Sequence, residues 1–127
     1  MKYYVNNLAY GKGSVGDEAI LAGLLTQFKD VVVGSYDPME TRWIHRVAAV
    51  DLSTPYHDYD CLLIGGGAIL TSSGIFGISQ LVEKARKDGK RVEFRAVDFG
   101  PCPERLIPIV QVLKLADRVT VRSRRAM

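Results

Sequence analysis

The chain has 127 residues, of which 47% are hydrophobic and 24% are charged, and its formal net charge at pH 7 is +3. This composition is ordinary for a globular protein, and we expect one domain with a proper hydrophobic core over residues 1–127. No apolar stretch approaches the roughly 20 residues that a membrane span needs. The mild positive charge comes without any RNA- or DNA-binding motif, which argues against a nucleic-acid partner.

The cysteines and histidines give no sign of a metal site. Cys61 and Cys102 lack metal-ligand spacing, and Cys61 lies in an apolar run typical of a core. Two thiols without a signal peptide favour a reducing compartment, so we expect a cytoplasmic protein. His45 and His57 have no cysteine or serine partner at a recognisable spacing, and we interpret both as solvated side chains without a catalytic role.

The first half of the chain alternates strand and helix patterns. Apolar spacing predicts a strand at residues 3 to about 9, a helix at 17–29 and a strand at 31–36, and residues 39–46 and 47–50 are compatible with a short helix and a short strand. Asp17 stands near the predicted helix N-cap, where a carboxylate accepts a backbone N–H and complements the helix dipole.

The second half repeats this alternation. Residues 59–64 predict a strand whose apolar run, residues 61–64, ends in Gly65-Gly66-Gly67, as in a strand covered on both faces. The remaining patterns predict a helix at 78–87, a strand at 92–99 that ends at Gly100, a helix that opens at Pro103 and a final strand at 118–122.

This alternation predicts an α/β fold, a Rossmann-like parallel sheet with helices on both faces and with Leu24, Leu63, Ile64 and Val119 buried. Glycines follow three of the strands, and the carboxyl ends of parallel strands line the ligand crevice in such sheets. A glycine at a strand end also has a plain explanation, because turns need positive φ. Three cases at the same edge favour a ligand site there.

The first glycine loop admits a dinucleotide interpretation. Gly11 to Gly16 satisfies G-x-G-x-x-G, and Asp37 ends the next strand about twenty residues on, where a ribose-binding acid belongs. Against it, Asp17 and Glu18 place two carboxylates at the helix N-terminus, where the pyrophosphate would lie. We therefore expect nicotinamide or flavin dinucleotides to bind more weakly than ~1 mM.

Four segments in order resemble the polysaccharide pyruvyl transferase family. Its Gly-Asp-Glu-Ala-Ile signature, its triple-glycine block, its Gly-Pro strand end and its Ala-Asp block are similar to residues 13–21, 60–70, 99–101 and 116–122. The chain departs from the family pattern at Ser14, Ala96, Asp98 and Ser123.

The resemblance implies an activity and an architecture. Members of the family transfer the enolpyruvyl unit of phosphoenolpyruvate to a sugar hydroxyl as a ketal, in the biosynthesis of cell-envelope polysaccharides. Phosphoenolpyruvate is then a co-substrate, no other cofactor is needed, and the acceptor is a sugar or glycolipid. The family resembles two-domain GT-B-like enzymes, and this chain looks like the N-terminal half, so a second domain or chain would complete the cleft.

The resemblance also suggests site residues. Asp17 is the candidate for binding or deprotonating a sugar hydroxyl, although a plain helix-capping role explains it equally well. The candidate substrate-binding residues are Gly13, Ser14, Gly16, Gly65, Gly66, Gly67, Gly100 and Arg122, the last of which would hold an anion.

Two further expectations concern the whole molecule. A non-catalytic module that binds a sugar or a nucleotide is compatible with the same sequence, because fold does not determine function. An apolar wall of Ile69, Leu70, Ile75 and Phe76 at the open edge favours self-association, so we expect a homo-oligomer.

Overall fold

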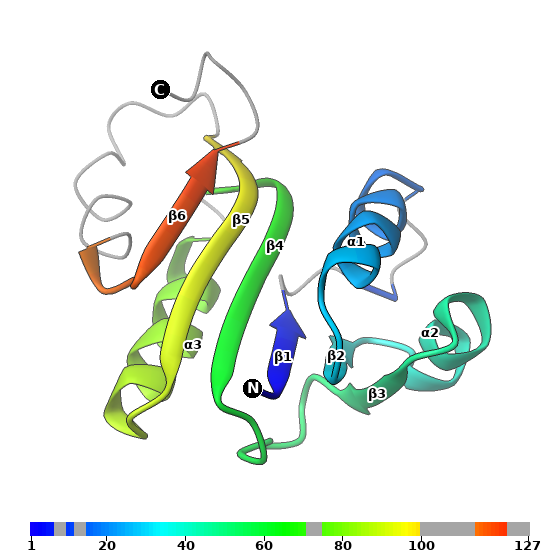
Figure 1. Cartoon of the computed structure of the whole chain (residues 1–127), viewed down its shortest axis with the longest axis horizontal. Helices are drawn as coiled ribbons and strands as arrows, with labels where there is room; N and C mark the ends of the chain where they lie inside the picture. The colour runs from blue at the N-terminus through cyan, green and yellow to red at the C-terminus, as the bar shows by residue number, and fades with distance from the viewer. Residues whose placement is uncertain (7–9, 12–14, 71–74, 100–113, 122–127) are drawn as a thin grey trace.

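The computed structural model describes residues 1–6, 10–11, 15–70, 75–99 and 114–121 (Figure 1). Its centre is one sheet of six parallel strands in the order β3-β2-β1-β4-β5-β6. In chain order the elements are β1 (Tyr3–Asn6), α1 (Val15–Gln27), β2 (Val31–Ser35), α2 (Pro38–His45), β3 (Ala48–Asp51), β4 (Cys61–Leu70), α3 (Ile75–Lys87), β5 (Arg91–Phe99) and β6 (Arg118–Val121).

The strand order places a topological switch point in the middle of the sheet. The chain builds outward from β1 through β2 to β3, returns to β4 beside β1, and builds outward again through β5 to β6. β1 and β4 pair in register from Tyr3 with Cys61 to Asn6 with Ile64. In sheets of this kind the crevice outside the carboxyl ends of two such strands is the usual ligand site.

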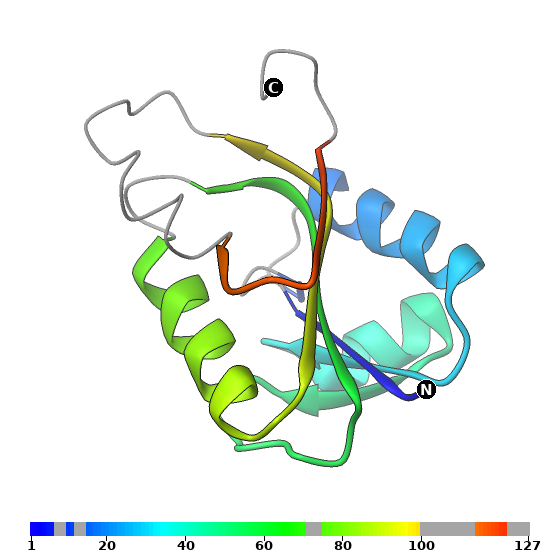
Figure 2. The same cartoon turned by 60° about the vertical axis from the view of Figure 1, so that its left-hand side comes forward.

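The helices cover both faces of the sheet, as predicted. α1 and α2 lie on one face and α3 on the other (Figure 2). The cluster on the α3 side consists of Tyr4, Tyr59, Leu62, Ile64, Ile78, Val82, Ala85, Val92 and Phe94. The cluster on the α1 side consists of Val5, Tyr10, Leu21, Leu24, Val31, Val33, Ala49 and Leu63.

The return from β3 to β4 is made by residues 52–60, which hold no helix. Tyr56 and Tyr59 from this segment pack against Tyr4 of β1, with ring centroids 5.0 and 5.2 Å from the Tyr4 ring. Aromatic rings bury much apolar surface for each residue. The three tyrosines thus cover the part of the α3-side face that a crossover helix would otherwise cover.

The structure corrects the predicted boundaries of three elements. α1 begins at Val15 and α3 at Ile75, two and three residues before the predictions, and the end of the predicted first strand, residues 7–9, lies outside the described residues. β4 runs through the three glycines to Leu70, so these glycines do not form a loop. The physical reason is that ladder pairing needs only backbone groups: Gly65 pairs with Arg95 and Gly67 with Val97.

The prediction of burial is confirmed for Leu24, Leu63 and Ile64. It was wrong for Val119, which is 39% exposed. β6 is the outermost strand of the sheet, so its residues have a neighbouring strand on one side only.

The helix predicted to open at Pro103 lies outside the described residues. Among the described helices, none combines the length and the apolar character required to cross a membrane.

Candidate functional site

The carboxyl edge of the sheet is held together by Tyr10, which follows β1. Its backbone O accepts a hydrogen bond from Tyr36 N at 2.9 Å, beyond the end of β2. Its hydroxyl donates to Gly65 O on β4, also at 2.9 Å, and the side chain is fully buried. Tyr10 therefore joins three strands at the switch point.

Gly11 follows in a conformation that requires glycine. Its φ is +87°, and a Cβ there would lie 2.7 Å from Asp37 N and closer still to Ser35 Oγ. A larger residue would be strained both by its backbone and by its neighbours. The first glycine of the loop thus has a local packing role on the end of β2.

Glu18, in the first turn of α1, contacts two partners from different segments. One carboxylate oxygen accepts the Gly11 N–H at 3.3 Å, and the other lies 3.1 Å from His45 Nε2 at the end of α2. The side chains of Glu18 and His45 are 18% and 6% exposed. Glu18 thus bridges the glycine loop and the second helix; among the residues that the structure describes, no lysine or arginine forms an ion pair with it.

The prediction that both histidines are solvated was wrong for His45 and is confirmed for His57. The His45 side chain is only 6% exposed, and its Nε2 lies 3.1 Å from Glu18 of α1. His57 is 57% exposed and lies 3.4 Å from Asp88. The pattern missed His45 because its partner, Glu18, is 27 positions away along the chain.

Asp17 is the third residue of α1 and is partly exposed. Burial, followed by the negative charges of Asp17 and Glu18, raises the pKa of Tyr10 well above 10.0. The Tyr10 hydroxyl therefore remains protonated and keeps donating to Gly65 O. Two carboxylates and a hydrogen-bonding histidine give this edge the character of a site for hydroxyl groups rather than for anions.

Asp37 acts as the N-cap of α2. Its carboxylate accepts the Glu40 N–H at 3.1 Å, and its own N–H donates to Ser35 Oγ at 3.0 Å. Ser35 Oγ is also 2.7 Å from the hydroxyl of buried Thr41. The carboxylate that the dinucleotide interpretation assigns to a ribose thus has a structural function.

Gly65 is explained by packing. A Cβ at this position would lie 2.6 Å from the Tyr10 hydroxyl and closer still to Leu24 Cδ1. The α1 side of Gly65 is therefore filled by the protein itself. A substrate contact by Gly65, Gly66 and Gly67 stays a prediction.

The other predicted site residues are only partly placed. Gly16 is the second residue of α1, and Gly66 and Gly67 lie within β4. Ile69 and Leu70 close β4, and Ile75 and Phe76 begin α3. Gly13, Ser14, Gly100 and Arg122 lie outside the described residues.

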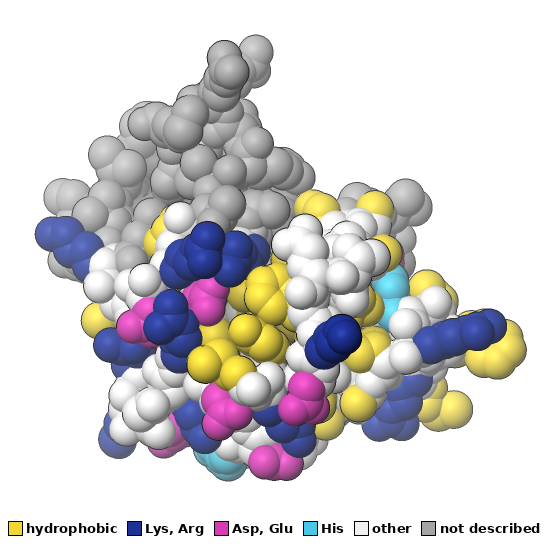
Figure 3. Space-filling view, viewed as in Figure 1, with side chains coloured by type: hydrophobic (Ala, Val, Ile, Leu, Met, Phe, Trp, Pro, Cys, Tyr) yellow, Lys and Arg dark blue, Asp and Glu magenta, His cyan; other side chains and the backbone are white. Residues whose placement is uncertain are grey.

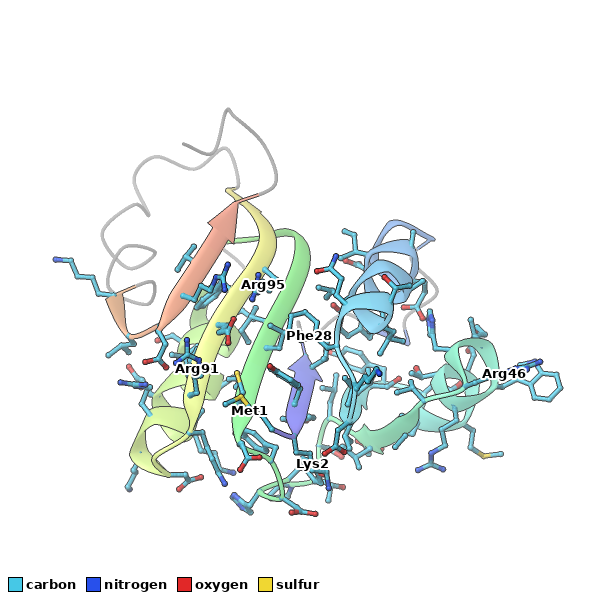
Figure 4. All side chains as sticks on the ribbon, in the orientation of Figure 1. Met1, Lys2, Phe28, Arg46, Arg91 and Arg95 are labelled. Atoms are coloured by element: carbon cyan, nitrogen blue, oxygen red, sulfur yellow. The ribbon has the colours of Figure 1, made fainter. Side chains whose placement is uncertain are left out.

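A charged row on β5 was missed by the sequence analysis. Glu93 is 5% exposed and accepts hydrogen bonds from Arg91 Nε at 3.1 Å and from a terminal nitrogen of Arg95 at 2.9 Å. The Arg95 guanidinium also lies 5.3 Å from the centre of the Phe28 ring (Figure 4). Its Nε is buried and has no hydrogen-bond partner among the described residues. Polar residues at every second position of 91–95 were the signal: one face of β5 is charged, and the other carries Val92 and Phe94.

This row perturbs its neighbours. Burial would raise the pKa of Glu93, but the hydrogen bonds from Arg91 and Arg95 outweigh it and hold the pKa below 4.5. Burial, followed by the charge of Glu93, raises the pKa of Cys61 to about 12. Cys61 is therefore an unreactive core thiol, as predicted.

Among the described residues, no group of His, Cys, Asp and Glu side chains is arranged to hold a metal ion. Comparison of the chain with protein-family models, with curated proteins and with solved structures gives no match.

Proposed function

We propose that this domain is one wall of a pyruvyl transferase-like site that transfers the enolpyruvyl unit of phosphoenolpyruvate to a sugar hydroxyl. The proposal rests on the resemblance of four segments to the polysaccharide pyruvyl transferase family. It includes the two-domain GT-B-like architecture, in which the opposite wall comes from a second domain or chain.

The observation that carries the proposal is that carboxylates, rather than free N–H groups, lie at the first glycine loop. Its Gly11 N–H is already bound by the Glu18 carboxylate, and Asp17 stands beside it in the first turn of α1. A pyrophosphate needs free N–H groups and positive potential at this point. Carboxylates instead suit sugar hydroxyls, which they bind as acceptors and deprotonate as general bases. Asp17 remains the candidate for this role.

The donor's phosphate and carboxylate need cations. Arg95 is the register neighbour of Gly65 on β5, and its buried Nε–H has no hydrogen-bond acceptor within the part of the chain that the structure describes. Arg95 is a candidate for one contact to phosphoenolpyruvate, although one of its terminal nitrogens already donates a hydrogen bond to Glu93. Two anionic groups ordinarily call for more than one arginine fork. We therefore assign the remaining cations to the second wall.

The experiment that tests this proposal uses the chain alone. We expect no phosphate release from phosphoenolpyruvate in the presence of methyl hexosides as acceptors, because one wall lacks the necessary cations. Acceptor-dependent phosphate release by the isolated chain would contradict the division into two walls.

The role of Asp17 has its own test. Asp17→Asn should weaken saturation-transfer signals from the methyl hexosides and leave phosphoenolpyruvate binding unchanged or tighter, because a negative charge is removed. The matched control is Glu83→Gln on α3. If Asp17 only stabilises the helix, the variant should lose about 0.3–1 kcal/mol of stability with both ligands unaffected.

The dinucleotide alternative is tested by calorimetry with NAD. We expect a Kd weaker than ~1 mM. Tight, saturable NAD binding that Asp37→Ala abolishes would establish that alternative instead.

A further inference from the structure

Helix α2 buries polar side chains and exposes apolar ones, which is the reverse of an ordinary surface helix. Thr41 is fully buried and His45 is nearly so, and both hydrogen-bond inward, to Ser35 and to Glu18. Met39 and Trp43, one turn apart, are 77% and 84% exposed. A surface helix normally buries its apolar stripe and exposes its polar one. In α2 the polar stripe is inside and the apolar one outside.

The outward stripe is large for so short a helix. Ile44 and Tyr36 add side chains that are 52% and 50% exposed. Figure 3 shows hydrophobic side chains beside Lys or Arg side chains at the end of the molecule where α2 lies. Tryptophan, tyrosine, methionine and arginine are the residue types enriched at protein–protein interfaces, and tryptophan is frequent among hot spots.

The charges of α2 are divided between its ends. Asp37 caps the helix and Glu40 lies in its first turn, whereas Arg42 lies in its last turn and Arg46 is the C-cap. Arg42 is fixed in place by hydrogen bonds of 2.6 and 3.2 Å to Ala49 O. Arg46 projects from the outer side of the helix, away from the sheet (Figure 4).

We propose that α2 is a dimer interface and that its partner is α2 of a second copy of this chain, packed antiparallel about a twofold axis. In that arrangement the acidic start of each helix faces the basic end of the other, and Met39 and Trp43 pack across the axis. A twofold interface must be self-complementary, and a helix with opposite charges at its two ends satisfies that condition. The surface is small, so the dimer should have a Kd of about 10–100 μM.

The sequence offers a direct reporter, because Trp43 is the only tryptophan of the chain. We expect sedimentation velocity to show a monomer–dimer equilibrium. Over the same concentration range, Trp43 emission should shift to shorter wavelength and acrylamide quenching should decrease. A monomer at every concentration up to ~1 mM, with unshifted emission, would overturn the proposal.

Three variants locate the contact. Trp43→Ala, followed by sedimentation, should weaken the dimer at least about tenfold without lowering the melting temperature, since the indole is exposed. Glu40→Lys and Arg46→Glu should each weaken it, and the double variant should recover part of the affinity. Leu115→Ala, at an exposed leucine outside α2, is the matched control and should have no effect.

The remaining outcomes contradict the proposal. A dimer that persists unchanged in Trp43→Ala would place the interface elsewhere. An emission shift that appears only on addition of phosphatidylcholine–phosphatidylglycerol vesicles, with a monomeric protein in their absence, would identify the stripe as a lipid-binding surface.

Discussion

The two faces of the sheet are covered by different kinds of side-chain contact. On the α3 side, Phe94, Ile78 and Val82 are fully or almost fully buried in a cluster of aliphatic and aromatic side chains. On the α1 side, apolar residues share the space with the buried Tyr10–Gly65 hydrogen bond and the Glu18–His45 pair.

The two kinds of contact have different consequences for the protein. Apolar packing stabilises in proportion to the area buried and tolerates modest repacking. A buried polar network depends on geometry, because each unsatisfied group costs about 1–3 kcal/mol. The α3 side should therefore supply folding free energy, and the α1 side should fix the atoms of the candidate site.

The largest effect is expected from Phe94→Ala, on the α3 side. Phe94 is fully buried, and its truncation should lower the free energy of unfolding by about 3–5 kcal/mol. Urea unfolding at neutral pH measures this loss. A loss below about 1 kcal/mol would show that the α3-side cluster does not dominate stability.

Gly65→Ala tests packing on the α1 side. The new methyl group would meet Leu24 and the Tyr10 hydroxyl, and we expect a loss of about 1–3 kcal/mol. Gly23→Ala is the matched control, because a Cβ there has open space within an exposed helix position. That control should gain about 0.5–1 kcal/mol. Equal effects of the two substitutions on thermal unfolding would remove the packing explanation for Gly65.

Tyr10→Phe removes one hydroxyl at the switch point. The Gly65 carbonyl would lose its donor in a buried position, and we expect a loss of about 1–2 kcal/mol. Hydrogen exchange of the amides that follow Gly65 should accelerate more than exchange in α3. Unchanged stability would mean that this hydrogen bond makes no net contribution to the free energy of unfolding.

Glu93→Gln should have the smallest effect, about 1 kcal/mol, and one that depends on pH. The pKa of Glu93 is lowered in the folded protein, so its contribution is present above about pH 4.5 and is lost as pH falls through the folded-state pKa. The variant should be less stable than the parent at pH 7, and the difference should be smaller at pH 3. Urea unfolding at both pH values checks this; a difference that grows at low pH would have the wrong sign.

Local patterns were sufficient for most of the fold. Continuous apolar runs such as residues 61–64 and the amphipathic spacing around Leu21 and Leu24 predicted a parallel α/β sheet with helices on both faces, and the structure confirms it. Boundaries failed at the triple glycine, because turn propensity suggested a loop where the ladder continues. Burial failed at Val119, because the sequence does not say which strand is outermost.

The site was less predictable for a physical reason. Glycines and the acid pair could be recognised locally, but the contacts that define the site join distant positions. Examples are Glu18 with His45, and Tyr10 with Gly65. Gly65 was interpreted as a ligand contact, which stays a prediction; at both Gly11 and Gly65 the structure shows that the space a side chain would need is filled by neighbouring atoms. One-dimensional spacing does not distinguish these two reasons for a glycine.

The central claim is that the α1 side of the carboxyl edge receives the ligand. A titration of ¹⁵N-labelled protein with a methyl hexoside, followed by amide chemical shifts, tests it at the ~mM affinities expected of one wall. Saturable shifts should appear at Gly11 and Glu18, with the amides of Ile78 and Val82 unaffected. Shifts confined to the α3 side, or no saturable shift up to ~10 mM, would contradict the account.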